Sequence, residues 1–222
     1  LESVEHGERW GRWSFVGRRP VATLVARGLD VTVEGDDPGV LDAVADGIPL
    51  DEGMLAAVEA VLARARTPEG LGLPPLHGGL LGYLGYDVVR EVEHLPDVPT
   101  DDHGLPDSIL SVIGEVAAFD HWRQRVTLIA NAYVAPRSDR AGVDAAYDAA
   151  VARLDAMAAD GARPLAEPLL DPPAPDDDLP EVTSSMSPGV YGAAVEAAKE
   201  HILAGDVFQV VLSQRFDLDL GA

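Results

Sequence analysis

The chain has 222 residues, of which 47% are hydrophobic, so it can build a sizeable core and is not disordered as a whole. Its 38 acidic residues outnumber the 16 basic ones and give a net charge of −22, which repels phosphate backbones and anionic membrane surfaces. Cysteine is absent, which excludes disulfides, thiolate metal sites and cysteine nucleophiles. No apolar run is long enough for a membrane span and no signal-peptide pattern is present, so we expect a cytoplasmic protein. From the charge we expect neither nucleic acid nor a membrane as a partner.

The first part of the chain is predicted to form strands. Residues 21–27 and 29–34 alternate apolar with polar side chains and are rich in β-branched residues, and Gly28 between them suits a tight turn. Another strand is predicted over residues 78–86, where recurring glycines indicate that a second backbone approaches closely. We therefore expect β structure over residues 12–34 and again over residues 78–86.

Two helices are predicted from the spacing of apolar residues. In residues 51–66 apolar positions recur every three or four residues, Asp51 suits the N-cap, and Pro68 follows the end. In residues 139–159 the spacing is the same, and Gly161 suits the position just after the last turn. The apolar stripes consist of Leu55, Val58, Leu62 and Ala65 in the first helix, and of Val143, Tyr147, Ala150, Leu154 and Met157 in the second.

A β-hairpin is predicted between these two helices. Residues 109–119 and 125–134 are two apolar runs, and each has the composition of a strand. The polar residues 120–124 separate them over a length that suits a hairpin connection. We therefore expect two antiparallel strands joined by this turn.

The last part of the chain changes in character. Residues 164–180 contain six prolines and little periodicity, which is typical of a linker. Ser187 and Pro188 then suit the N-cap and first position of a helix that extends to Ala204. Residues 206–213 are almost continuously apolar, which predicts a strand buried on both faces. The predicted buried face of the helix consists of Tyr191, Val195, Ala198 and Ile202.

These elements predict an α+β fold of mainly antiparallel sheets with flanking helices. We expect an N-terminal domain over residues 1–163, a linker rich in Pro and Asp over residues 164–187, and the first helix and strand of an incomplete second domain over residues 188–222. The chain begins without Met and stops shortly after the last predicted strand. We therefore expect it to be a piece of a longer protein.

Composition and spacing alone indicate few candidate sites. No Walker motif is present, and the glycines of residues 79–85 do not have the spacing of a dinucleotide fingerprint. Asp101, Asp102 and His103 could coordinate a cation, but a solvated loop between two prolines is the favoured interpretation.

Several segments together resemble one protein family. Residues 197–216 are similar to the opening of the chorismate-binding domain of anthranilate synthase component I. Residues 1–3, 8–17 and 78–87 resemble parts of the N-terminal domain of that family in the same order, and residues 119–121 are also similar to it. The resemblance spans essentially the whole chain, and it implies the N-terminal domain of the family followed by the start of its catalytic domain.

The resemblance implies a lyase of tryptophan biosynthesis. In this family ammonia adds at C2 of chorismate while the 4-hydroxyl group leaves with the help of Mg²⁺, and pyruvate is then eliminated to give anthranilate. A glutamine amidotransferase subunit, component II, supplies the ammonia. The family's metal ligands and chorismate-binding basic residues belong to a part of the catalytic domain that the chain lacks. The resemblance thus implies that this chain alone is inactive.

The resemblance also implies a site for L-tryptophan as a feedback inhibitor. In this family Leu1, Glu2 and Ser3 belong to the inhibitor pocket, where Ser3 can hydrogen-bond the amino acid and Glu2 can neutralise its ammonium group. Arg12 stands near a position at which the family often offers a cation to the ligand. The alternative for Arg12 is an ordinary exposed arginine on a strand.

Gln209 is the candidate catalytic residue that distinguishes this chain from related enzymes that add water. Isochorismate and salicylate synthases resemble this segment but have Lys at that position, and a Lys of lowered pKa can activate water as a general base. A Gln amide cannot take a proton, which suits an enzyme whose nucleophile is ammonia. The alternative is that Gln209 only satisfies buried backbone groups.

Two other functions stay open at this point. Aminodeoxychorismate synthase component I, which serves the folate pathway, has the same fold and the same Gln. A non-catalytic regulatory module that binds tryptophan would belong to a different class of protein. The resemblance of residues 1–3 and 206–216 favours anthranilate synthase over both.

Overall fold

The computed structural model describes residues 11–36, 38–67, 72–135, 137–165, 174 and 181–219. The chain divides into two compact units, Leu1–Pro164 and Leu165–Ala222, and each is described by itself. Leu1, Glu2 and Ser3 lie outside the described residues.

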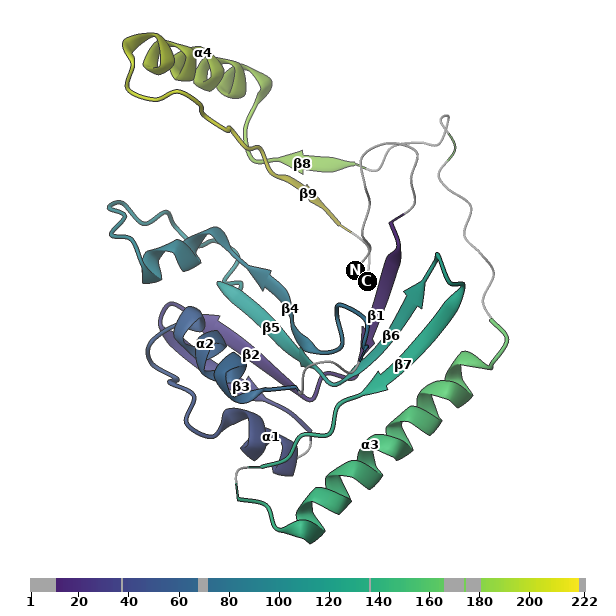
Figure 1. Ribbon diagram of the computed structural model, residues 1–222. Coiled ribbons are helices and arrows are strands. Elements are labelled where there is room, and N and C mark those ends of the chain that lie inside the picture. Colours follow the sequence, from purple (N-terminus) through teal and green to yellow (C-terminus); the bar gives the residue numbers. More distant parts are fainter. Residues whose placement is uncertain are drawn as a thin grey trace. The chain divides into compact units, whose positions relative to one another are not determined.

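Two antiparallel sheets form the first unit (Figure 1). Their strands are β1 (Trp13–Arg18), β2 (Ala22–Arg27), β3 (Asp30–Glu34), β4 (Gly79–Leu84), β5 (Ser108–Ile113), β6 (Glu115–Asp120) and β7 (Arg125–Ala130). One sheet has the strand order β1–β6–β7 and the other the order β3–β2–β5–β4. With the helices described below, this arrangement confirms the predicted α+β fold of mainly antiparallel sheets.

The chain passes twice from one sheet to the other. Pro20 and its neighbours separate β1 from β2, and Gly114 alone separates β5 from β6. A Cβ atom on Gly114 would lie 2.6 Å from Cγ1 of Val21, so no side chain fits where the two crossings meet. The prediction of one strand over residues 109–119 is therefore wrong, because this glycine divides it between two sheets. The predicted hairpin is confirmed as β6 and β7, although β7 ends at Ala130 rather than at residue 134.

The close backbone approach predicted from the glycines of β4 is confirmed. A Cβ atom on Gly82 would collide with the carbonyl oxygen of Ile109 on β5, its neighbour in the sheet. Just after the strand, a Cβ atom on Gly85 would lie 2.6 Å from the carbonyl oxygen of Asp107. These two glycines let β4 pair with β5 along its whole length.

Two helices, α1 (Pro38–Ala45) and α2 (Met54–Arg64), pack on one face of the four-stranded sheet (Figure 1). Their core with the sheet includes the fully buried Leu24 and Met54. The predicted N-cap at Asp51 is wrong, because α2 begins later. Gly53 precedes the helix, and the carboxylate of Glu91 accepts hydrogen bonds of 2.8 Å from the backbone N–H groups of Met54 and Leu55. Glu91 belongs to the short 3₁₀ helix η1 (Tyr86–Glu91), so this cap comes from a distant part of the chain.

The long helix α3 (Arg140–Gly161) packs along β7 of the three-stranded sheet (Figure 1). Its N-cap is Asp139, whose side chain accepts a hydrogen bond of 2.8 Å from the N–H of Gly142. The helix extends to Gly161, with Ala162 at the C-cap, so it ends two residues later than predicted and the predicted position of Gly161 beyond the helix is wrong. Ala150 and Met157 of the predicted apolar stripe are buried, whereas Tyr147 is exposed.

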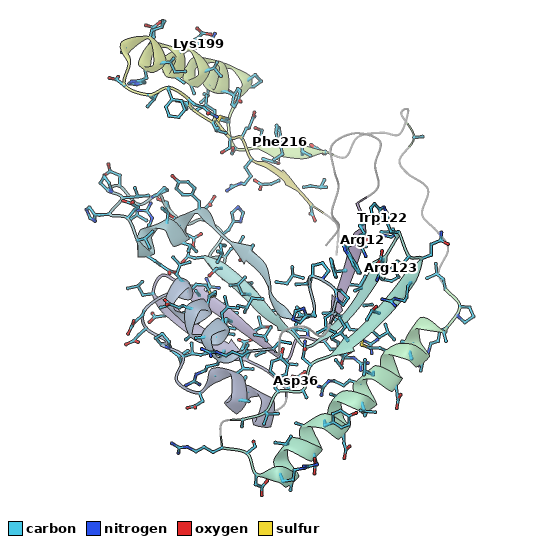
Figure 2. All side chains as sticks on the ribbon, in the orientation of Figure 1. Arg12, Asp36, Trp122, Arg123, Lys199 and Phe216 are labelled. Carbon is cyan, nitrogen blue, oxygen red and sulfur yellow. The ribbon has the colours of Figure 1, made fainter. Side chains whose placement is uncertain are left out.

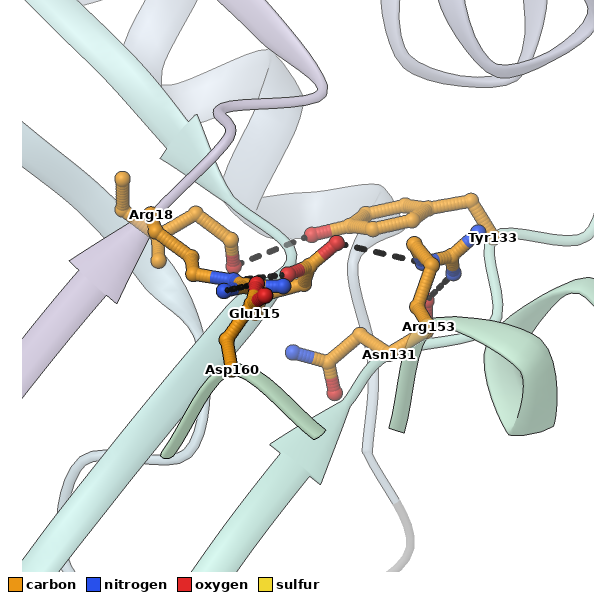
Figure 3. Close-up of polar contacts among 7 residues, drawn as sticks. Arg18, Glu115, Asn131, Tyr133, Arg153 and Asp160 are labelled. Carbon is orange, nitrogen blue, oxygen red and sulfur yellow. Dashed lines mark hydrogen bonds and ion pairs between the residues drawn. The ribbon is translucent and has the colours of Figure 1, made fainter. Parts of the chain in front are cut away.

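A buried polar network joins β1, β6 and α3 at one end of the three-stranded sheet (Figure 3). Glu115 accepts a hydrogen bond of 2.7 Å from Nε of Arg18, and Nη1 of Arg18 donates to Asp160 at 2.6 Å. Nε of Arg153 lies 4.0 Å from Oε1 of Glu115. The hydrogen bond from Arg18 is the main cause that lowers the pKa of Asp160 below its ordinary value. Charged groups thus tie α3 to the sheet.

The second unit contains α4 (Pro188–Ala204) and a small sheet of β8 (Val182–Ser184) and β9 (Phe216–Leu218). The bounds predicted for the helix are confirmed, with Ser187 at the N-cap and Gly205 in the left-handed region at φ 83°. No residue of α4 is buried, so the predicted buried face is wrong in this unit. None of the helices in the described ranges is long and apolar enough to cross a bilayer.

The strand predicted over residues 206–213 is also wrong for this unit. After α4, the next strand begins only at Phe216, and Phe208 is 93% exposed. An apolar run of this kind becomes a strand only when neighbouring strands accept its backbone hydrogen bonds and cover its faces. The described part of this unit offers only the short strands β8 and β9.

Candidate functional site

Charged and aromatic side chains gather at the other end of the β1–β6 pair. Trp13 on β1 pairs with Asp120 on β6 as the last pair of the register, and Arg12 directly precedes β1. The N–H of His121 donates to the carbonyl oxygen of Arg12 at 2.9 Å and holds the two segments together. Figure 2 shows Arg12 and Trp122 at this same end of the sheet. We call these residues the Arg12–Asp120 end.

The ion pair between Arg12 and Asp120 is bidentate. Nε and Nη2 of Arg12 donate to the two carboxylate oxygens at 3.2 Å and 2.8 Å. The backbone N–H groups of Trp122 and Arg123 donate to Oδ1 of Asp120, each at 3.2 Å. Asp120 is only 2% exposed, and these partners satisfy its carboxylate and fix its position.

These contacts hold Asp120 in its charged form. The hydrogen bond from Arg12 is the largest cause that lowers the pKa of Asp120 to about 2, and the turn N–H groups and the charge of Arg12 add to it. Burial opposes the shift but is outweighed. A carboxylate of such low pKa cannot serve as a general acid or base near neutral pH, so Asp120 acts as an anchor for Arg12.

Two indole rings lie against the guanidinium group. Cζ of Arg12 is 4.9 Å from the ring centroid of Trp13 and 5.5 Å from that of Trp122, which are cation–π distances. Trp13 also stacks on Phe15, with ring centroids 5.9 Å apart, whereas Trp122 is 79% exposed. Two of the five N–H donors of Arg12 point at Asp120. The arrangement can therefore offer the remaining donors and an exposed aromatic face to a ligand that carries a carboxylate and a ring.

A serine and a histidine meet beside this cluster. Oγ of Ser14 lies 2.7 Å from Nε2 of His121, and the contact is exposed. Nucleophilic catalysis by such a pair needs a third group that orients the imidazole. The adjacent acid, Asp120, bonds to Arg12 and the turn instead. We therefore assign this pair no catalytic role.

The structure places only part of the predicted site residues. Arg12 lies at the Arg12–Asp120 end, where it is half-buried and paired rather than an isolated exposed arginine. Gln209 belongs to the second unit and is exposed in a segment without regular structure. Sequence reasoning missed Asp120 and Trp122, although it identified the turn in which they lie. A buried acid at the end of a strand, 108 residues from its arginine, leaves no periodic signal.

The described residues do not fit a metal site. Among them, no group of three or more His, Asp or Glu side chains could hold a metal ion together. Oδ1 of Asp101, one of the candidate ligands, accepts hydrogen bonds from the backbone N–H groups of His103 and Gly104 at 3.1 Å and 2.8 Å. This contact is typical of a loop that a side chain stabilises.

Comparisons with known proteins agree with one another. The family of chorismate binding enzymes matches residues 9–222. Anthranilate synthase component 1 of Mycobacterium tuberculosis (strain ATCC 25618 / H37Rv) is 43% identical over 220 residues, which cover 99% of this chain and 41% of that protein. The proteins of the same name from Mycolicibacterium smegmatis and Cereibacter sphaeroides are 39% and 38% identical, over 100% and 99% of this chain and 40% and 42% of theirs. The chain thus spans about two fifths of the length of these relatives.

A solved structure shows the same fold. The crystal structure of anthranilate synthase component I from Streptococcus pneumoniae TIGR4 matches with a TM-score of 0.57 and 24% identity. The match covers 96% of this chain and 43% of that chain. The resemblance noted in the sequence is confirmed by these findings.

Proposed function

Because the chain belongs to the chorismate binding enzyme family, we propose that it forms part of an anthranilate synthase component I, a lyase of tryptophan biosynthesis. The observation that carries this proposal is the 43% identity to anthranilate synthase component 1 of Mycobacterium tuberculosis over 99% of the chain. The fold shared with the Streptococcus pneumoniae structure is consistent with it. We further propose a cytoplasmic location.

The proposed reaction combines chorismate with ammonia. A C–N bond forms at C2 of the ring while the C4–O bond breaks, and the 4-hydroxyl group leaves as water after it takes a proton. The proton at C2 and the enolpyruvyl group are then lost together, which yields anthranilate and pyruvate. In this proposal Gln209 positions a reacting group by hydrogen bonds, since its amide cannot act as a base.

The remaining components of the reaction are proposed to come from outside this chain. Ammonia is supplied from glutamine by an amidotransferase subunit. The described residues hold no metal cluster. We propose that Mg²⁺ and chorismate bind residues in the part of the relatives' sequence that this chain does not cover. Mg²⁺ would supply Lewis-acid chemistry at the substrate.

An activity assay tests this proposal. We expect the 222-residue chain to make no anthranilate from chorismate, Mg²⁺ and excess ammonium, followed by anthranilate fluorescence. The longer protein encoded by the same gene is expected to make it under the same conditions. Turnover by the chain alone would contradict the placement of the metal and chorismate sites. Release of aminodeoxychorismate by the longer protein would favour the folate enzyme, and no turnover with retained tryptophan binding would favour the regulatory module.

We propose L-tryptophan as a feedback inhibitor that binds at the Arg12–Asp120 end. The support is the resemblance of Leu1, Glu2 and Ser3 to the family's inhibitor pocket and the position of Arg12. The guanidinium held by Asp120 offers donors that suit a carboxylate, and the neighbouring indole rings suit an aromatic side chain.

Replacement of Ser3 tests the inhibitor site in the longer protein. A serine hydroxyl that binds the inhibitor contributes about 0.5–1.5 kcal/mol, and a larger side chain adds a steric clash. Ser3→Phe should therefore raise the tryptophan concentration for half inhibition tenfold or more, since ~1.4 kcal/mol is a factor of ten. Ser138→Phe, at an exposed serine of the first unit, is the matched control. Equal inhibition of both variants and the wild type would show that Ser3 does not contact tryptophan.

A further inference from the structure

A cavity of the first unit lies between α2 and the start of β4. Its volume is about 410 Å³, within the range of small-molecule sites. The end of α2 and the residues after it form one side, and Gly78, Gly79 and the segment after β7 form the other. None of the residues of the Arg12–Asp120 end lines it. The cavity is therefore separate from the proposed inhibitor site.

The charge of this cavity is opposite to that of the chain. Its described lining includes Arg64, Arg66 and His77 and no acidic residue, although the chain has a net charge of −22. Nη1 of Arg64 lies 3.5 Å from Asp46, a weak pair at an exposed carboxylate. Nε of Arg66 donates to the carbonyl oxygen of Ala63 at 3.2 Å, and Arg66 forms no ion pair with any described residue. Such a lining attracts anions and repels cations.

The walls of the cavity combine apolar and polar surface. Val61 and Val112, which also belong to the buried core, supply apolar lining that we call the valine floor, while Thr67, Asn131 and Tyr133 contribute polar atoms. A cavity with apolar walls and a few convergent charged groups suits a small amphipathic ligand. The two arginines suit a carboxylate, with which guanidinium groups form charge-assisted hydrogen bonds.

Hydrogen bonds hold the far wall in place before any ligand binds. Nδ2 of Asn131 donates to the carbonyl oxygen of His77 at 2.8 Å. Nη2 of Arg153 donates to the carbonyl oxygen of Asn131 at 2.7 Å (Figure 3). A Cβ atom on Gly78 would lie 2.6 Å from Nδ2 of Asn131, so the glycine is needed for this contact. Nδ1 of His77 lies 3.1 Å from the carbonyl oxygen of Pro74. A wall fixed in this way reduces the entropy that a ligand must overcome.

We propose that this cavity binds a small organic anion, with Arg64 and Arg66 holding its carboxylate and the valine floor holding its apolar body. Neither the family resemblance nor the proposed reaction assigns a ligand to these residues. Benzoate is a suitable probe, because it has one carboxylate and one apolar ring. Benzamide has nearly the same shape but no charge, and it tests the role of the arginines.

The experiment is a titration of the 222-residue chain by NMR, with benzoate and benzamide as the two probes. We expect benzoate to shift the amide signals of Gly78, Gly79 and residues 131–134, and to bind at least tenfold more tightly than benzamide. Arg66→Gln and Arg64→Gln should each weaken benzoate binding about tenfold. Arg140→Gln, at an exposed arginine of α3, is the matched control and should bind benzoate as the wild type does.

Several outcomes would overturn this inference. Equal affinity for benzoate and benzamide would show that charge plays no part. Benzoate shifts confined to the signals of Trp13 and Trp122 would assign the anion to the Arg12–Asp120 end instead. Unchanged affinity in both arginine variants, with spectra that show a folded chain, would exclude the assigned residues. Arg66 is exposed, so its replacement is expected to leave the fold intact.

Discussion

The two ends of the β1–β6 pair carry the same kind of ion pair in different surroundings. At one end Arg12 binds Asp120, and at the other Arg18 binds Glu115. Both carboxylates are at most 2% exposed. At the first end a turn and the exposed Trp122 surround the pair, whereas at the second end α3 covers it and adds Asp160 as a further partner.

This difference separates a structural ion pair from one that can bind a ligand. The covered pair belongs to a network in which Arg18 donates to Glu115 and also to Asp160 of α3, so its guanidinium is already shared between two carboxylates. The network is also imperfect, since Oε1 of Glu115, Nε of Arg153 and Nη2 of Arg18 have no hydrogen-bond partner among the described residues. Buried pairs of this kind cost desolvation energy, and removal of one partner costs more. The open pair instead keeps its guanidinium beside an exposed ring.

The largest predicted effect is at the covered end. Glu115→Gln keeps the volume of the side chain but removes the carboxylate charge that faces Arg18 and Arg153. We expect the free energy of unfolding to fall by ~3 kcal/mol, the low end for a broken buried pair because Arg18 is 27% exposed and keeps Asp160. Urea unfolding followed by circular dichroism measures it. An unchanged midpoint would show that the network does not stabilise the fold.

A smaller effect is predicted for Asp120→Asn at the open end. The asparagine oxygen can still accept the N–H groups of the turn, but the charge that anchors Arg12 is lost. We expect a smaller drop in the urea midpoint than for Glu115→Gln, together with a weaker response to tryptophan in the longer protein. A larger drop than for Glu115→Gln would reverse the comparison between the two ends.

The lowered pKa of Asp120 in the open pair should be visible in how stability depends on pH. The pKa of Asp120 is about 2 in the folded chain against an ordinary 3.8, so its charged form stabilises the fold above pH ~4. This contribution is lost as the pH falls from about 4 towards 2. The difference in thermal midpoint between wild type and Asp120→Asn should therefore be constant above pH 5. Below pH 4 this difference should become smaller. A difference at pH 2 as large as that above pH 5 would contradict the lowered pKa.

The smallest effect is predicted on the outer face of α3. Arg140 forms an exposed pair with Asp144 one turn further along the helix, with side chains 88% and 56% exposed. Such pairs contribute about 0.5 kcal/mol or less to stability. The free energy of unfolding of Arg140→Gln should therefore differ from that of the wild type by no more than this amount. A loss comparable to that of Glu115→Gln would show that burial is not what distinguishes these arginines.

Local patterns predicted much of the fold. The alternation in β2 and β3, the polar turn after β6 and the N-cap of α4 at Ser187 depend on neighbours in the sequence, and the structure confirms them. The glycines of β4 indicated a close backbone approach, which Gly82 makes to β5. These signals work because strand alternation, helix capping and glycine conformation are properties of a few adjacent residues.

Only the tertiary structure decided the features that depend on distant parts of the chain. Gly114 divides an apparently continuous strand because Val21 occupies the space beside it, and Glu91 rather than Asp51 caps α2 because η1 brings its carboxylate there. Of the residues at the Arg12–Asp120 end, the sequence predicted only Arg12 as a site residue. Its partner Asp120 is set by the register of β1 against β6, which no local pattern contains. The sequence by itself determined the family and most of the elements, whereas the pairing of charges across 108 residues required the folded sheet, because long-range contacts are selected by packing and register rather than by adjacent residues.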